Sequence, residues 1–132
     1  MTNTRLTDPE VLEARFPVRL VSFRIRRGSG GRGRHPGGDG VVREIEFLES
    51  LDVSIVSQRR STPPYGLCGG GDGQVGRNRI RHGTTGEEEL LPSVALVKVR
   101  PGDRLIIETP GGGGYGGLCR TGPRDVPPEK RA

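Results

Sequence analysis

Short runs of alternating apolar and polar residues, separated by glycine- and proline-rich stretches, form the main pattern of this chain. Such runs are typical of half-buried β-strands. They lie at residues 18–25, 41–48, 53–57, 94–99 and 104–109. In the first run the apolar phase slips between Leu20 and Val21, which predicts a β-bulge. The chain is therefore predicted to be mainly β.

Local sequence also predicts how several of these elements begin, end and connect. Residues 7–10, Thr-Asp-Pro-Glu, predict one short N-terminal helix with Thr7 or Asp8 as its cap, and Phe16-Pro17 ends it. Residues 49–52 are short enough to connect a hairpin between the second and third runs. Residues 100–103, Arg-Pro-Gly-Asp, fit a type II turn and predict a second hairpin.

Glycine is concentrated in three clusters, at residues 28–40, 66–76 and 111–117. Because glycine permits positive φ and close backbone approach, these clusters predict loops with demanding geometry, and residues 63–78 are expected to be loop. Only 30% of the 132 residues are hydrophobic, and the chain contains 23 Gly and 11 Pro. Few large apolar side chains are therefore present to form a core. We therefore expect a partial domain of a larger protein component, marginally stable alone, with residues 117–132 as a disordered tail.

The formal charge of +5 and the Arg-Gly segment at residues 29–38 are features of some nucleic-acid-binding proteins. The segment lacks repeated Arg-Gly-Gly units and has few aromatic residues, so an ordered loop folding over a sheet edge is the favoured interpretation. Residues 28–33 also match G-x-G-x-x-G, but no helix is predicted to follow, and the chain has no P-loop motif. Nucleic acid is thus an unlikely partner, and no bound nucleotide cofactor is expected.

Few side chains suggest catalysis or metal binding. Two histidines and two cysteines, Cys68 and Cys119, form no zinc pattern, and the cysteines are expected to be reduced thiols. Ser29 and Ser57 have no base partner at motif spacing, so no catalytic residue is assigned. Without a signal sequence or an apolar stretch long enough to span a membrane, a cytoplasmic location without membrane contact is expected.

One pair of residues does suggest a binding site. Arg59 and Arg60 precede a rigid Pro-Pro-Tyr-Gly segment, and guanidinium groups on a fixed loop could hold a carboxylate, a phosphate or bicarbonate. A solvated strand end is about equally consistent with the same residues.

Three long motifs follow one another along the chain: FPVRLVSFRIRRGSGGRGRHPGGDGVVREIEFLE, SQRRSTPPYGLCGGGDGQVGRN and VRPGDRLIIETPGGGGYG. In sequence and in order they resemble the C-terminal part of the hydantoinase B/5-oxoprolinase family. The resemblance covers residues 1–116. It departs after Gly116, where relatives commonly continue with Asp-Pro, and at Pro92-Ser93-Val94, where they often have Gly-Lys.

The resemblance implies the terminal module of the B component of an ATP-dependent amidohydrolase that opens a cyclic amide such as 5-oxoproline or a hydantoin, with relatives that carboxylate ketones. ATP and a divalent metal would be held by an actin-like ATPase partner, and none by this chain. The other expected partners are the remainder of the B component and the substrate. The residues expected to contribute to substrate or anion binding are Asn3, Thr4, Arg59, Arg60 and Asn78. A purely structural role for the glycine loops within that complex is the alternative.

Overall fold

The computed structural model describes residues 5–117, which begin with the predicted short helix, α1 (Pro9–Arg15). Asp8, rather than Thr7, is its N-cap, and the Asp8 carboxylate accepts a hydrogen bond from the N–H of Glu10 at 2.9 Å. Phe16 adopts extended backbone and ends the helix before Pro17. The Glu13 side chain then accepts a hydrogen bond from the N–H of Leu20, which attaches the helix to the first strand.

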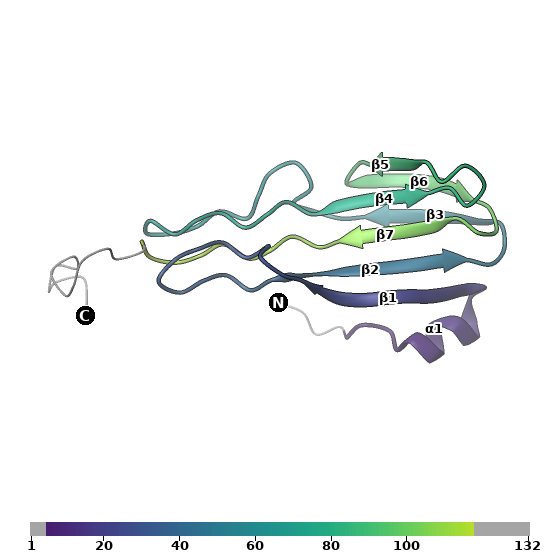
Figure 1. Ribbon diagram of the computed structural model, residues 1–132, viewed down its shortest axis with the longest axis horizontal. Coiled ribbons are helices and arrows are strands. Elements are labelled where there is room, and N and C mark those ends of the chain that lie inside the picture. Colours follow the sequence, from purple (N-terminus) through teal and green to yellow (C-terminus); the bar gives the residue numbers. More distant parts are fainter. Residues whose placement is uncertain (1–4, 118–132) are drawn as a thin grey trace, which may run out of the picture.

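Within residues 5–117, seven strands follow the helix and form two antiparallel sheets (Figure 1). The larger sheet has the order β1-β2-β7-β4-β5, and the smaller consists of β3 and β6. The strands are β1 (Val18–Arg26), β2 (Gly40–Phe47), β3 (Leu51–Val56), β4 (Arg77–Arg81), β5 (Glu88–Leu91), β6 (Val94–Val99) and β7 (Arg104–Glu108). The mainly β prediction is confirmed, and so is the bulge in β1, where the register shifts between Leu20 and Ser22.

Both predicted hairpins are wrong, although their strands are present. β2 pairs with β1 and β7, whereas β3 pairs, in the described part of the chain, only with β6 in the other sheet. The predicted turn does form: Gly102 has φ +91°, and the N–H of Asp103 donates to the carbonyl of Arg100 at 3.1 Å. It carries the chain from one sheet to the other instead of joining paired neighbours. β4 and β5 lie in a part of the sequence where no strand was expected, and they pair with each other.

The core lies between the two sheets. Alternate residues of each strand point inward, and the buried members of the core are Val18, Phe47, Ile55, Ile80, Leu91, Val99 and Leu105. The outer face of the larger sheet has arginine and glutamate side chains paired across neighbouring strands. Glu88, one of three consecutive glutamates, binds Arg79 at 3.0 Å and Arg81 at 2.6 Å, so its charge is balanced within the sheet.

The three glycine clusters pack against one another as a long extension beyond the strand ends (Figure 1). Their backbone hydrogen bonds recur every three residues, which is the period of the polyproline II helix and not that of a strand. The donor pairs spaced by three residues are Gly31 and Arg34, Gly71 and Gln74, Gly111 and Gly114, and Gly112 and Tyr115, and each donates to an adjacent segment. The expectation of demanding loop geometry is confirmed.

Glycine is required in this extension because its chain segments are in backbone contact. A Cβ atom at Gly114 would collide with the carbonyl of Arg32, and one at Gly111 would collide with that of Ser29. Only glycine permits such approach, as at the crowded axis of collagen. The Arg-Gly segment is therefore an ordered part of the fold.

Candidate functional site

The candidate site lies where the glycine extension meets the sheets, and it contains three of the five predicted residues. Arg59 and Arg60 follow β3, and Asn78 lies on β4. The Nε of Arg60 donates to Oδ1 of Asn78 at 3.1 Å, so the structure brings these two together. Asn3 and Thr4 lie outside the described residues.

The side chain of Asn78 is fixed in the candidate site by its burial and its hydrogen bonds. Its side chain is fully buried on the inner face of β4, beside Ile80 in the core. Its Nδ2 donates to Oγ of Ser57 at 2.9 Å, and the Ser57 hydroxyl donates to the carbonyl of Ser93 at 2.8 Å. Both polar atoms of the Asn78 amide are thus engaged, which a buried amide requires. Asn78 orients Arg60, and its burial leaves it no direct access to a ligand.

The guanidinium of Arg60 is held through Nε and Nη1. Besides Asn78, it binds the carbonyl of Gln58 through Nη1 at 2.6 Å, and its guanidinium fills the space over Gly76. Its Nη2 makes no hydrogen bond within the described chain. Arg60 therefore combines a fixed guanidinium with a donor that is available to a ligand.

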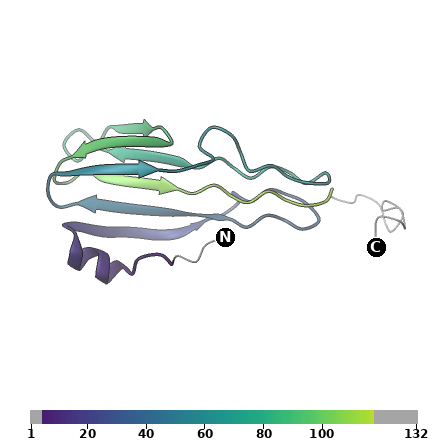
Figure 2. The ribbon, with the colours of Figure 1, turned by 180° about the vertical axis from the view of Figure 1, so that it is seen from behind.

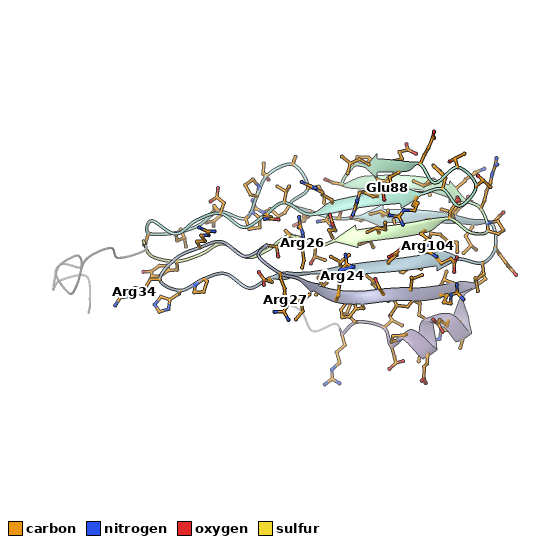
Figure 3. All side chains as sticks on the ribbon, in the orientation of Figure 1. Arg24, Arg26, Arg27, Arg34, Glu88 and Arg104 are labelled. Carbon is orange, nitrogen blue, oxygen red and sulfur yellow. The ribbon has the colours of Figure 1, made fainter. Side chains whose placement is uncertain are left out.

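A second guanidinium, that of Arg26, contacts Val75, the residue next to the glycine over which Arg60 packs. Arg26, labelled in Figure 3, ends β1 on the outer face of the larger sheet, opposite Gly40. Its Nη1 donates to the carbonyls of Val75 at 2.8 Å and Thr109 at 3.0 Å. Burial lowers the pKa of Arg60, and the positive charge of Arg26 lowers the pKa further. Arginine nevertheless remains charged at neutral pH.

No described carboxylate compensates these two charges. Among residues 5–117, neither Arg26 nor Arg60 has an Asp or Glu oxygen within 4.0 Å, whereas the arginines Arg79 and Arg81 of β4 are paired with glutamates. Two partly buried cations with only neutral partners favour an anion between or beside them. The sequence analysis missed Arg26. Its signal was its position as the last outward-facing residue of a strand directly before a glycine cluster.

Arg59 takes a different position from Arg60. Its φ of +56° is in the left-handed region, which is uncommon for a residue other than glycine. Its guanidinium lies 5.8 Å from the ring centroid of Tyr65 and donates to the carbonyl of Pro63 at 3.4 Å. These contacts fix the loop, in agreement with the rigid segment predicted there, and they direct Arg59 away from Asn78 toward Tyr65.

Among the remaining candidate side chains, Ser29 is engaged in structure. Ser29 is fully buried, donates to the carbonyl of Arg26 at 2.6 Å and accepts from the N–H of Gly40 at 2.8 Å, so its hydroxyl is not a free nucleophile. Cys68 is a free, exposed thiol, and Cys119 lies outside the described residues. Within the part of the chain that the structure describes, no three His, Cys, Asp or Glu side chains form a metal-binding group, and no helix is long and apolar enough to cross a membrane.

Comparison with known proteins connects this site to a family. The sequence profile of the family described as hydantoinase B/oxoprolinase matches residues 1–118. A 5-oxoprolinase of Dictyostelium discoideum is 47% identical over 116 residues, which are 88% of this chain and 9% of that protein. The B component of a putative D-/L-hydantoinase of Pseudomonas sp. is 33% identical over 125 residues, which are 94% of this chain and 21% of that one.

A solved structure is similar as well. The crystal structure of an ATP-dependent caprolactamase from Pseudomonas jessenii superposes with a TM-score of 0.73 at 32% identity, and the match covers 83% of this chain and 20% of that chain. This chain thus spans about a tenth of the length of the oxoprolinase relative and about a fifth of the hydantoinase relative. From its sequence motifs, its profile match and its fold, the chain belongs to the hydantoinase B/oxoprolinase family.

Proposed function

We propose that residues 1–116 act as the C-terminal module of the B component of an ATP-dependent enzyme that opens a cyclic amide, with Arg60 and Arg26 binding an anionic group of the substrate or of its activated form. Support comes from relatives named as a 5-oxoprolinase, a putative hydantoinase and an ATP-dependent caprolactamase. The single observation that carries the anion site is that two guanidiniums, those of Arg26 and Arg60, contact the adjacent residues Val75 and Gly76 without a described carboxylate partner.

The chemistry of such enzymes explains why an anion site is useful. An amide oxygen is a poor leaving group, and phosphorylation by an ATPase partner converts it into a good one. 5-Oxoproline also carries a carboxylate, so both substrate and activated form present anionic oxygens. A guanidinium held by Asn78 loses little conformational freedom when it binds such oxygens. In this proposal ATP and its metal are bound by the ATPase component, and the remainder of the B component completes the site.

The alternative is that Arg60 has only a structural role. Its bonds to Gln58 and Asn78 and its packing over Gly76 join the end of β3 to the start of β4, which supports that alternative. The two roles differ in what an Arg60→Ala variant should lose: turnover by an assembled enzyme, or assembly itself.

The test uses a complete B component that contains this sequence, assayed with its ATPase partner and 5-oxoproline. Arg60→Ala is expected to lower kcat/KM about ten- to a hundredfold, since a hydrogen bond to a charged group contributes roughly 1.5–3 kcal/mol. Arg77→Ala is the matched control, because Arg77 is an exposed arginine that precedes Asn78 on β4 and points to the opposite face. Wild-type kinetics for Arg60→Ala, or a loss of activity that follows failed assembly alone, would support the structural alternative.

A further inference from the structure

The second sheet covers only part of the first. Among the described residues, five strands form the larger sheet and two form the smaller. Figures 1 and 2 place β6 over β4 and β5, and β3 over β4 and β7. Beyond β3, no described strand lies over β2 and β1 on this inner face, as Figure 2 shows from behind. The two layers of the sandwich are therefore unequal.

Along one row of residues on the inner face, the side chains under the second sheet are more buried than those beyond it. The cross-strand partners Leu91, Asn78, Ile107, Arg43 and Phe23 form a continuous row from β5 to β1. The exposed fraction is 7% for Leu91 and 0% for Asn78 under the second sheet, but 46% for Phe23 at the opposite end. Ile25, on the same face of β1, is 58% exposed. Two large apolar side chains thus face the side where the second layer is missing.

β3 borders this uncovered area with a free edge. In the described chain it pairs with β6 alone, so about half of its backbone N–H and C=O groups point away from β6 without a strand partner. Exposed strand edges of this kind readily pair with an added strand. An apolar surface therefore lies beside an open row of backbone donors and acceptors.

The positive charge of Arg43 restricts the chemistry of a segment that would cover this face. Arg43 lies between Phe23 and Ile107 in the row, and among residues 5–117 no carboxylate lies within 4.0 Å of its guanidinium. A segment that covers this face would be extended and mainly apolar, with an acidic residue or a carbonyl opposite Arg43.

We propose that an extended apolar segment from the remainder of the B component pairs with β3 and covers Phe23 and Ile25, extending the second sheet to at least three strands. This inference rests on the proposed function, in which the chain is one module of a larger protein. About four-fifths of the hydantoinase relative lies outside the part that this chain matches, so such a component has ample polypeptide to supply the segment.

Hydrogen exchange tests the pairing directly. The experiment compares this 132-residue chain with a chimera in which residues 1–118 replace the matching segment of the Pseudomonas jessenii caprolactamase chain. We expect amides of residues 51–56 to exchange at least about tenfold more slowly in the chimera, because an added strand would bond the free edge. Equal exchange in the two proteins would overturn the proposal.

A matched pair of variants tests the apolar contact. Phe23→Ser with Ile25→Ser is expected to lower the melting temperature of the chimera by several degrees and to leave that of the isolated chain nearly unchanged. Arg24→Ser lies between them on the outer face of β1 and should change neither. Equal effects of the double variant on chimera and isolated chain would contradict docking at this face.

Two further experimental outcomes would also decide whether the proposed segment docks on this face. If the chimera does not fold, the caprolactamase chain lacking its matching segment is co-expressed with this chain, and failure to form a complex then counts against the proposal. If the isolated chain dimerises with protected β3 amides, self-association replaces the proposed partner. These measurements require no turnover, so a wild-type rate for Arg60→Ala would refute the anion site without affecting docking.

Discussion

The Nε of Arg60 donates to Oδ1 of Asn78 at 3.1 Å, which joins a loop residue after β3 to a fully buried residue of β4. The strands β3 and β4 belong to different sheets, so this contact forms only when the sheets pack. The candidate site is thereby a product of tertiary structure, and its geometry depends on a fully buried amide.

Replacing Asn78 by Asp should preserve the orientation of the Arg60 guanidinium while neutralising its positive charge. The carboxylate can still accept from Arg60 but neutralises its charge, so we predict a rise in KM for an anionic substrate of about tenfold or more. Steady-state kinetics of the assembled enzyme measure this change. Asn78→Ala is the comparison: it leaves Ser57 and Arg60 without their buried partner and should lower the free energy of unfolding by about 1–3 kcal/mol.

Tight packing of the glycine extension predicts unequal effects of alanine. Gly114→Ala would drive a methyl group into the carbonyl of Arg32, so it should lower the free energy of unfolding by roughly 2 kcal/mol or more. Gly38→Ala is the control, because a Cβ atom there has no other atom within 4 Å; it should be neutral or stabilising by about 0.4–1 kcal/mol. Chemical denaturation measures both, and equal effects would show that the extension is not packed as described.

Strand positions were largely predictable from the sequence, but strand pairing was not. The turn at residues 100–103 formed as its Pro-Gly pair predicts, because turn geometry is decided locally. Whether the strands on either side then pair depends on distant partners: β7 bonds β2 and β4, while β6 bonds β3. Proximity in sequence therefore gave two wrong hairpins.

One of the two missed strands, β4, has few apolar residues. β4, Arg-Asn-Arg-Ile-Arg, has Ile80 as its single apolar residue, and its three arginines all face outward. Inward and outward residues do alternate along β4. The alternation of apolar and polar residues is absent from its sequence because one inward position is occupied by the polar residue Asn78. The importance of Arg26 was hidden for a related reason: its partners are backbone carbonyls of residues far along the chain. The family motifs indicated Arg60 and Asn78, but only the fold places Arg26 near them.

The isolated chain is predicted not to hydrolyse ATP, since its glycine-rich segments form the extension and no nucleotide motif is present in its sequence. Purified protein with Mg-ATP should release phosphate at the rate of the buffer blank. Turnover that persists after repurification and disappears when a residue of this chain is substituted would contradict this prediction.

Acid should destabilise the fold through Asp103, which is buried at the turn between β6 and β7. Burial alone would raise the pKa of Asp103, but backbone N–H groups of Arg100 and Gly83, at 2.9 and 3.0 Å, and the nearby His82 outweigh it and hold the pKa below its ordinary value. A carboxyl group whose pKa is lower in the folded state stabilises the protein above its unfolded pKa. That stabilisation is lost as the pH falls through the folded pKa.

We therefore predict that the free energy of unfolding falls as the pH is lowered below about 5, and that Asp103→Asn reduces this dependence. At neutral pH the variant should be less stable by roughly 1–3 kcal/mol, because the carboxylate accepts from Gly83 through Oδ1 and from Arg100 through Oδ2, whereas the amide has only one acceptor oxygen. Asp72→Asn is the control, since Asp72 accepts one backbone hydrogen bond, from Gly66, at an exposed position. Denaturant titrations between about pH 7 and pH 3 measure all three proteins. If Asp103→Asn and the unmodified chain lost stability in parallel over this range, the acid sensitivity would have to come from carboxylates other than Asp103.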